Sequence, residues 1–562
     1  MKKNITVLVV TMLLNAANIF AQSGTTGPLE WILEDGVLTI SGEGAMPDYD
    51  YPSYAPWFAY RESIHAVVME TGVTTIGDGA FPYCENLTSI TVPNSVASVG
   101  YMSFYECKSL LSIIIPEGVT KIEEETFAYC ESLTSVIIPN SVTTIGYRAF
   151  DYCENLTSAT IPNNLIEIGS YAFQCCRRWT ASIIFPNSLT WIGDDAFYGC
   201  ESLTSITIPN SVDFIGWFAF SVCTSLTSIN VESGNPYYAS DDGVLFNKNK
   251  TALICCPAGK TGTYVVPKSV MWFGTDAGAY EAFRSCINLT SIEVENGNNY
   301  FASENGALFD KGKTNLICCP AGRTGDYVIP DCATNIEFYS FVGCIKLTSI
   351  TIPNNITSMG ERAFGECTNL TSITIPNSIT KIENEVFMYC KGLTSITFPN
   401  TLKSIGDRAF TDCASLSLIT NLNPVPPAVG FAAFHRVDVG ACTLEVPIGS
   451  VLAYKNAYGW SGFNIVGIDA GIETIEPDIV KIYPNPTDGE LWVECKDAIN
   501  RVSTITITNI EIFDVFGRCV YIAHPSLREG LGGLDISNLP TGMYFVRITT
   551  ENGAVTKKVV KR

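Results

Sequence analysis

Cysteine is the residue type whose chemistry and spacing first need explaining. The chain has 21 cysteines, and from Cys84 to Cys413 most of them follow a phenylalanine by three residues. Thiols of an exported protein could pair as disulfides, but one cysteine per repeat leaves each thiol with two equivalent neighbours, and the total is odd. No Cys-x-x-Cys pair occurs, so a zinc site is not expected. We predict a ladder of reduced, buried thiols that pack as small apolar groups.

Two vicinal pairs, Cys255-Cys256 and Cys318-Cys319, could be redox-active, although the more ordinary expectation is that one member of each pair faces inward and the other outward. The three histidines are His65, His435 and His524, and only His435 has a cysteine, Cys442, close by in sequence.

A structural role in a terminal segment accounts for both His435 and Cys442. The repeat copies scatter their carboxylates singly, and the one run, Glu123-Glu124-Glu125, is expected at a solvated turn without a cleft. No glycine-rich phosphate loop occurs. We therefore expect no enzyme, no catalytic residues, no metal and no cofactor.

The elements that carry these cysteines repeat along the chain. The preceding phenylalanines are 23 residues apart, with one slip of a single residue, and two longer units separate Phe220 from Phe283 and Phe283 from Phe341. The series is Phe81, Phe104, Phe127, Phe150, Phe173, Phe197, Phe220, Phe341, Phe364, Phe387 and Phe410. A fixed period in this range is typical of a solenoid, in which stacked coils bury a common core.

One coil is represented by LTSITIPNSVDFIGWFAFSVC, residues 203–223. A first strand directs Leu203, Ile206 and Ile208 inward, Pro209-Asn210 turns the chain, and a second strand directs Val212 and Ile215 inward. Gly216 then bends the backbone, and Ala219, Phe220 and Cys223 close the coil. The pattern predicts a mainly β chain of about a dozen such coils.

The two longer units share one theme, in residues 235–267 and 298–330. Each holds two alternating segments, such as GVLF and TALICC, around a Lys/Asn turn. This pattern predicts a β-hairpin that projects from the stack of coils.

The termini and the charge indicate where the chain goes. Residues 1–21 combine Lys2 and Lys3 with a short apolar run and resemble a secretory signal peptide, with cleavage expected after Ala21. No stretch is long enough for a transmembrane helix. The net charge of −22 argues against nucleic acid or an anionic membrane as a partner.

The repeat pattern LxxIxIPxxVxxIGxxAFxxC, over roughly residues 64–420, resembles the leucine-rich repeats of the BspA type, also called the Treponema pallidum type. Residues 30–57, which end in Pro56-Trp57, and residues 442–466 resemble the segments that open and close such arrays. The resemblance implies a leucine-rich-repeat solenoid and a surface protein of a kind commonly described as adhesins, which bind extracellular matrix or serum proteins.

The C-terminal region resembles a type A sorting domain of type IX secretion. The residues that carry the resemblance are VKIYPNPTDGELWVE (480–494), IEIFDVFGRCVY (510–521) and the last stretch, 534–562, with its terminal KKVVKR. The resemblance implies a small β-sandwich that the secretion machinery recognises and removes, and attachment of the remainder to surface lipopolysaccharide. Short alternating strands between Asp-Gly, Phe-Gly and Thr-Gly turns agree with a β-sandwich.

These features predict six segments along the chain. They are a signal peptide (1–21), an N-terminal cap (22–63), the solenoid (64–420) with hairpin insertions near 232–264 and 295–327, a C-terminal cap (421–470), a linker (471–478) and the sorting domain (479–562).

A column of outward residues carries the candidate ligand-binding site. The residue just before the inward apolar residue of each second strand is mostly small or charged, but three consecutive copies in this column are aromatic. The column is Thr75, Ser98, Lys121, Thr144, Glu167, Trp191, Phe214, Trp272, Asn335, Ser358, Lys381 and Ser404. Trp217 adds a fourth aromatic residue just past Gly216. Trp191 and Phe214 are expected to stand about 5 Å apart, whereas the hairpin could separate Trp272 from them.

Exposed aromatic residues suit protein hot spots or sugar faces. We therefore expect an exported, cell-surface-attached binding protein that engages host extracellular or bacterial surface proteins, and no nucleic acid. The alternatives are a glycan-binding surface protein that uses the aromatic strip, and a structural spacer for display. A further possibility is that the hairpin of residues 235–267 covers the strip, which would then be packing.

Overall fold

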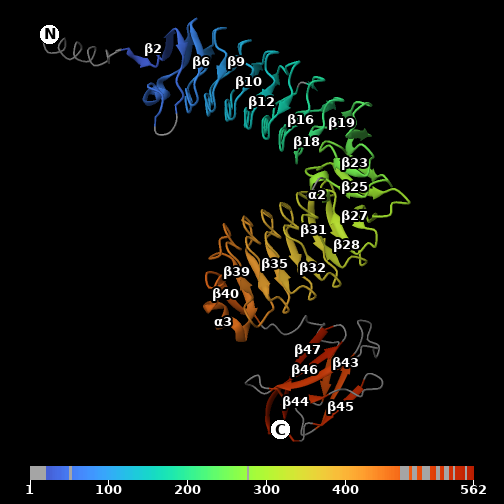
Figure 1. Ribbon diagram of the computed structural model, residues 1–562. Coiled ribbons are helices and arrows are strands. Elements are labelled where there is room, and N and C mark those ends of the chain that lie inside the picture. Colours follow the sequence, from blue (N-terminus) through green and yellow to red (C-terminus); the bar gives the residue numbers. More distant parts are fainter. Residues whose placement is uncertain are drawn as a thin grey trace, which may run out of the picture. The chain divides into compact units, whose positions relative to one another are not determined.

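The computed structural model describes residues 21–49, 53–180, 182–274 and 278–468, together with seven stretches of the C-terminal region (Figure 1). These stretches are 480–483, 490–495, 507–513, 519–523, 531–535, 538–550 and 553–561. The expected signal peptide, apart from Ala21, and the expected linker at 471–478 lie outside the described residues. Among the residues that are described, no helix is long and apolar enough to cross a membrane.

A small antiparallel sheet begins the described chain. Its strands are β1 (Gln22–Thr26), β2 (Leu29–Glu34) and β3 (Val37–Gly42), and a short strand β4 (Gly44–Ala45) and a 3-10 helix η1 (Phe58–Ser63) follow. β3 pairs in parallel with the first repeat strand, which places this sheet on the end of the stack. The buried Trp57 donates from its indole Nε1 to the carbonyl oxygen of Ala80 at 2.8 Å and stacks on Phe81. Trp57 thus covers the end of the apolar core.

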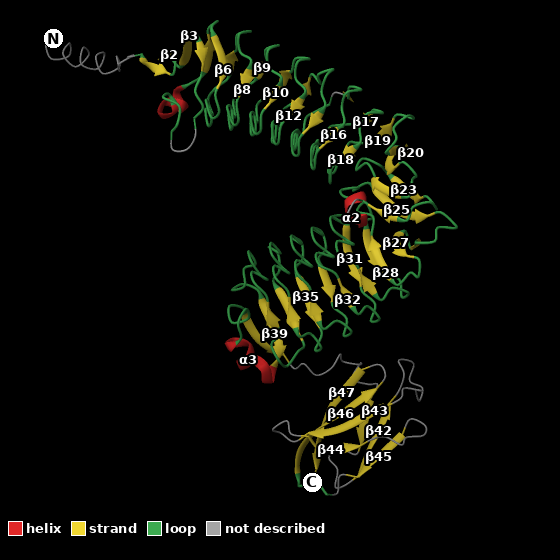
Figure 2. Ribbon diagram, in the orientation of Figure 1, coloured by secondary structure: helices red, strands yellow, loops and turns green. Residues whose placement is uncertain are grey.

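Short strands of the coils stack in register on two faces (Figure 2). The first face has β5 (Ala66–Met69), β7 (Ser89–Thr91), β9 (Ser112–Ile114), β11 (Ser135–Ile137), β13 (Ser158–Ala159), β15 (Ile183–Ile184), β17 (Ser205–Ile208) and β19 (Ser228–Val231). The second face has β6 (Val73–Ile76), β8 (Ser98–Val99), β10 (Lys121–Ile122), β12 (Thr144–Ile145), β14 (Glu167–Ile168), β16 (Trp191–Ile192) and β18 (Phe214–Ile215). The pairs are parallel, so equivalent residues of successive coils become neighbours, as in Ile145 beside Ile168.

The predicted inward residues are confirmed. In the coil of residues 203–223, Leu203, Ile206, Ile208, Val212, Ile215, Ala219, Phe220 and Cys223 are all buried. The phenylalanine column from Phe81 to Phe220 is stacked, with 5.2–5.9 Å between the centroids of neighbouring rings. The described fold is therefore the expected solenoid, with its core in the column of stacked rings.

The cysteine column is buried and hydrogen-bonded to the coil before it. Cys107 Sγ donates to the carbonyl oxygen of Phe81 at 3.2 Å, and Cys130 Sγ makes the same contact with Phe104. Seven further cysteines repeat the bond, namely Cys153, Cys176, Cys200, Cys223, Cys367, Cys390 and Cys413. This bond explains why a thiol, rather than another small apolar group, suits the position.

Tandem tight turns join the second strand of each coil to its cysteine. Their amides donate to the next coil, as Phe104 does to the carbonyl of Thr126 and Glu106 to that of Ala128, both at 2.9 Å. Two residues of each turn adopt positive φ, a conformation that costs side chains other than glycine some energy. The first set is Met102, Glu125, Arg148, Tyr171, Asp195 and Phe218, and the second is Tyr83, Glu106, Tyr129, Tyr152 and Cys175. We call the surface of these stacked turns the turn face.

The first longer unit contains β20 (Tyr238–Asp241), β21 (Val244–Asn247), β22 (Ala252–Cys255), β23 (Gly262–Val266), β24 (Trp272–Phe273), helix α2 (Gly278–Ala282) and β25 (Leu289–Val294). The expected hairpin is formed by β21 and β22, but it does not project: β22 also pairs in parallel with β24, and Phe246 and Leu253 are fully buried. The hairpin lies inside the stack because its apolar side chains complete the core.

The second longer unit repeats this arrangement with β26 (Phe301–Glu304), β27 (Ala307–Asp310), β28 (Asn315–Cys318), β29 (Gly325–Val328) and β30 (Asn335–Ile336). The expectation of one inward and one outward cysteine in each vicinal pair is wrong for the second pair. Cys318 and Cys319 are both buried, whereas Cys255 is half-buried beside the buried Cys256. Apolar side chains pack against both sides of the first hairpin, and Leu308 and Cys318 of the second hairpin belong to a buried apolar cluster, which leaves the cysteines little exposed surface.

The coils after the second unit contain β31 (Leu347–Thr351), β32 (Ser358–Met359), β33 (Ser372–Thr374), β34 (Lys381–Ile382), β35 (Ser395–Phe398), β36 (Ser404–Ile405), β37 (Leu418–Asn421) and β38 (Ala428–Val429). The closing segment has β39 (Thr443–Pro447), a 3-10 helix η2 (Ile448–Ser450), helix α3 (Val451–Asn456) and β40 (Asn464–Ile468). β35, β37, β39 and β40 pair in parallel. The buried Trp460 donates to the carbonyl of Pro427 and lies edge-on to Phe398, as a cap requires.

The C-terminal region forms two antiparallel sheets. One contains β41 (Val480–Tyr483), β42 (Glu490–Cys495) and β45 (Leu531–Asp535). The other contains β43 (Ile507–Phe513), β44 (Cys519–Ala523), β46 (Gly542–Thr550) and β47 (Gly553–Lys561). Ile512 and Val546 are buried in the second sheet. Packing of the two sheets as a sandwich stays a prediction.

Candidate binding surface

The candidate strip begins with two aromatic residues that parallel pairing brings together. Trp191 of β16 lies opposite Phe214 of β18 in the sheet. Their rings stack, with 3.7 Å between ring centroids and 14° between ring planes. On the other side of Trp191, the register places Glu167 of β14. The indole therefore stacks on a phenyl ring on one side and has an acidic residue as its strand neighbour on the other.

The pair is not covered by the following hairpin. Trp191 remains 41% exposed and Phe214 is partly exposed. Tyr238 of β20 comes next in the stack, where its hydroxyl oxygen accepts the amide hydrogen of Ile215 at 2.9 Å. The alternative that the hairpin of residues 235–267 buries the strip is therefore wrong: its strands continue the stack beyond Phe214 rather than folding over it.

Trp217 stands on the same coil as Phe214 and is 49% exposed. Its backbone amide donates to Asp194 Oδ1 at 2.7 Å, and its carbonyl accepts the amide of Asp195 at 2.8 Å. These two bonds to the preceding coil hold the backbone beneath the indole. Trp217 is thus presented from a rigid position on the turn.

The structure separates Trp272 from the other three residues. Trp272 of β24 pairs with Ala252 of β22, so the strands of the first longer unit lie between it and Phe214. It is 60% exposed. The predicted strip of four residues is therefore a stacked pair, Trp191 and Phe214, with Trp217 on the same coil and an isolated indole farther along the chain.

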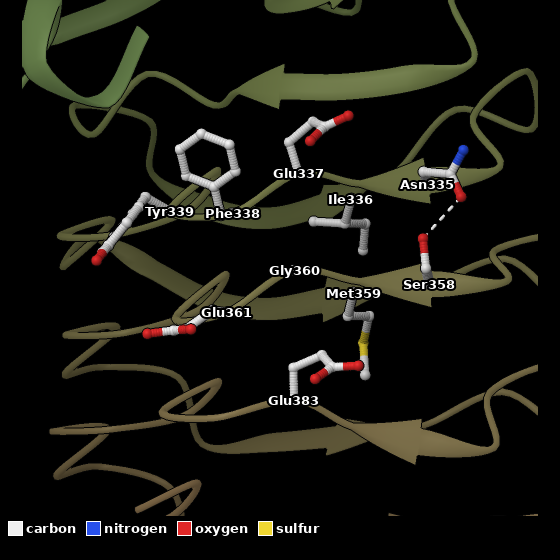
Figure 3. Close-up of a pocket in the computed structure, with 10 residues that line it drawn as sticks. All are labelled: Asn335, Ile336, Glu337, Phe338, Tyr339, Ser358, Met359, Gly360, Glu361 and Glu383. Carbon is white, nitrogen blue, oxygen red and sulfur yellow. Dashed lines mark hydrogen bonds between the residues drawn. The ribbon is translucent and has the colours of Figure 1, made fainter. Parts of the chain in front are cut away.

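Farther along, the second face carries an open groove of about 570 Å³ lined by both polar and apolar residues (Figure 3). Ser358 Oγ donates to Asn335 Oδ1 at 2.7 Å across neighbouring coils, as the dashed line marks. Glu337, Glu361 and Glu383 supply carboxylates, and the half-exposed Phe338 supplies one apolar wall. Burial, and to a lesser extent Asp310, raises the pKa of Glu337.

A second aromatic feature was not anticipated from the sequence. Six rings follow one another along the turn face of the first coils, each in contact with the next: Tyr54, Phe58, Tyr83, Tyr105, Tyr129 and Tyr152. We call this set the tyrosine row. The available signal was the tyrosine that stands directly before the repeat cysteine in FPYC, FAYC and FDYC. The offset Tyr105 breaks that pattern, so the row becomes visible only when the coils are stacked.

Cys442, the cysteine close in sequence to His435, lies in an environment that does not activate a thiol. Cys442 is buried, and burial, followed by the charge of Asp438, raises the pKa of its thiol to about 11. An activated thiol needs a lowered pKa. Among the described residues, no three His, Cys, Asp or Glu side chains are grouped as a metal site requires.

Comparison with protein families finds two matches. The BspA type leucine rich repeat region matches residues 54–180, 179–249 and 323–435, in six copies. Together these ranges cover more than half of the chain. A secretion system C-terminal sorting domain matches residues 481–562. No match to a curated protein is found.

Solved structures that match this chain include three leucine-rich repeat proteins. A leucine-rich repeat protein from Eubacterium ventriosum is 24% identical, with 80% of this chain and 94% of that chain covered and a TM-score of 0.37. A leucine rich cell surface protein from Faecalibacterium prausnitzii is 26% identical, with coverages of 71% and 94% and a TM-score of 0.42. A leucine-rich repeat protein from Bacteroides ovatus is 23% identical, with coverages of 71% and 92% and a TM-score of 0.37.

Proposed function

Because this chain belongs to the BspA-type leucine-rich repeat family and carries a secretion sorting domain, we propose that it is a surface-attached binding protein, an adhesin for host extracellular or bacterial surface proteins. The sorting domain implies export to the cell surface by type IX secretion. The signal peptide of residues 1–21, removal of the sorting domain and attachment of the remainder are part of the proposal.

The observation that carries the binding role is the exposed aromatic pair Trp191 and Phe214, with Trp217 on the same coil. Monomeric surfaces seldom leave large aromatic side chains in an exposed group unless the group is functional. Trp residues are also enriched among residues that dominate protein interfaces. The backbone of this strip is held by parallel pairing and by the bonds of Trp217, so little conformational entropy is lost on binding.

The ring geometry favours a protein over a glycan at the pair. A sugar packs against an open ring face, but Trp191 and Phe214 cover one face of each other at 3.7 Å. A stacked aromatic pair that includes an indole N–H donor suits a protein surface. The isolated Trp272, at 60% exposure, favours the alternative of glycan binding at a different place.

The test compares two variants of the chain from residue 22 onward on an array of host matrix and serum proteins, bacterial surface proteins and glycans. Trp191→Ala combined with Phe214→Ala should abolish protein binding, while Trp272→Ala, at a more exposed residue of the same column, should leave it unchanged. Both variants should keep the melting temperature of the parent.

Other outcomes separate the alternatives. Loss of glycan binding in Trp272→Ala alone would support a glycan receptor. Early melting of the Trp191/Phe214 variant with unchanged binding below that temperature would make the strip a packing feature. A chain that binds nothing on the array would favour a display spacer.

A further inference from the structure

The tyrosine row is a continuous aromatic surface distinct from the Trp191 and Phe214 pair. Successive ring centroids along Tyr83, Tyr105, Tyr129 and Tyr152 are 5.5, 5.6 and 5.1 Å apart. Tyr83 is 38% exposed and the other three are partly exposed. Three coil steps make this part of the row about 15 Å long. A segment of a few extended residues would match that length.

Carboxylates place a negative potential on the row. Burial is the largest cause of the raised pKa of Tyr83, and it is also the largest cause of the raised pKa of Tyr105, which is about 12. The charges of Glu106 and Glu125 raise the pKa values of both tyrosines further. Glu106 is paired with Lys108, which also binds Glu85. Glu125 forms no ion pair within the described part of the chain. The negative potential of these carboxylates disfavours the tyrosinate form, and the same potential favours a cation that lies over the rings.

Arginines of this chain already bind to aromatic rings near the row. The guanidinium of Arg61 lies 4.6 Å from the ring centroid of Phe58, at one end of the row. On the coil of Tyr152, the guanidinium of Arg148 lies 5.2 and 5.3 Å from the rings of Tyr147 and Tyr171. No arginine or lysine of the described residues is placed over the rings from Tyr83 to Tyr152. Arg148 is close enough that its charge opposes the rise in the pKa of Tyr129 that burial and Asp151 cause.

We propose that the turn face from Tyr83 to Tyr152 binds an arginine-rich segment of a partner protein, with guanidinium groups over the tyrosine rings and beside Glu106 and Glu125. Arginine suits the site better than lysine because its planar, weakly hydrated cation stacks on aromatic faces. The net charge of −22 reinforces attraction of a basic segment. This surface and its ligand class are additional to the proposed function, which rests on Trp191 and Phe214.

Calorimetric titration of the chain from residue 22 onward with a peptide of about eight arginines, long enough to span the row when extended, tests the proposal. At about 0.15 M salt, the arginine peptide should bind about fivefold more tightly than an equally long lysine peptide. Tyr129→Ser should weaken arginine binding by about fivefold, the loss expected for one cation–π contact.

A matched control comes from the same position of another coil. Tyr389 has φ 62°, against 60° for Tyr129, and it is also partly exposed. In the coils around Tyr389, however, the position equivalent to the tyrosine is occupied by Gly343, Glu366 and Asp412. Tyr389→Ser therefore makes the same change outside any row and should leave arginine binding unchanged. Trp191→Ala with Phe214→Ala should also leave it unchanged, which separates this site from the proposed function.

Lys108→Met supplies a gain of binding that damaged folding cannot imitate. Removal of the Lys108 ammonium group leaves Glu106 and Glu85 without their ion-pair partner. This should strengthen binding of the arginine peptide by about threefold. The proposal is overturned if the arginine peptide does not bind, if Tyr129→Ser and Tyr389→Ser have equal effects, or if Lys108→Met brings no gain. Equal affinity for arginine and lysine peptides would also overturn it, because it would indicate general charge attraction.

Discussion

The carboxylate of Asp151 lies 3.5 Å from Arg148 Nε on the turn face. Its other oxygen, Oδ1, has no hydrogen-bond partner among the described residues, although the side chain is only 1% exposed. The neighbouring coil adds a second unsatisfied buried oxygen, Gln174 Oε1. Burial raises the pKa of Asp151 to about 7, against the opposing effect of Arg148. The solenoid therefore buries a carboxyl group that titrates near neutral pH.

Replacing this group should change how stability depends on pH. An unfolded aspartate titrates near pH 4, so between about pH 4 and pH 7 the folded chain holds a proton that the unfolded chain has released. The stability contribution of Asp151 is therefore complete below about pH 4 and is lost as pH rises through 7. Asp151→Asn should remove this loss and stabilise the chain at pH 8 by about 1–3 kcal/mol.

Urea unfolding of the parent and the Asp151→Asn variant at several pH values measures the difference. Asp213→Asn, at an exposed aspartate, serves as the control and should follow the parent. A variant whose stability tracks the parent at every pH would show that Asp151 does not titrate in this range.

Native alkylation should distinguish one cysteine from the ladder. Cys332 is exposed, whereas the ladder cysteines are buried, and burial raises the pKa of Cys130 to about 12. Because the thiolate is the reactive form, iodoacetamide should label Cys332 within minutes and the ladder only after denaturation without reductant. Peptide mass spectrometry reads each site, and recovery of mainly coil-to-coil disulfide peptides would contradict an unpaired ladder.

Asn235 should be one of the most sensitive positions of the first longer unit. Its buried Nδ2 donates to the carbonyls of Pro209 and Val212, and its Oδ1 accepts the amides of Tyr237 and Tyr238. Asn235→Ala leaves these buried groups without their partner and should lower the free energy of unfolding by about 2–4 kcal/mol.

The second longer unit supplies the matched position. Asn298 makes the same four contacts, so Asn298→Ala should cost about as much as Asn235→Ala. Thermal unfolding followed by circular dichroism measures both variants. A loss confined to one of them would mean that the two units are not equivalent in stability.

Processing at the surface is tested on the protein that cells display. If the sorting domain is removed, mass spectrometry of surface material should find peptides of the solenoid but none from beyond about residue 478. Abundant peptides from residues 534–562 on surface-attached protein would refute removal.

Much of the fold could be predicted from the repeat, because each coil has the same sequence pattern. The inward positions of residues 203–223 and the burial of the cysteine column were predictable from alternation and period alone. The placement of the hairpins was not predictable in this way. Whether β22 projects or pairs with β24 depends on apolar surface presented by residues distant in sequence, such as Phe246 and Phe273.

The candidate surfaces were also predictable only in part. Adjacency of Trp191 and Phe214 follows from parallel register, which the period of the sequence determines. Exposure of the pair, separation of Trp272 and the tyrosine row were decided only by tertiary structure. A period specifies which positions become neighbours, but the path of the inserted strands determines what covers them, and only stacked turns bring Tyr105 into line with Tyr83 and Tyr129.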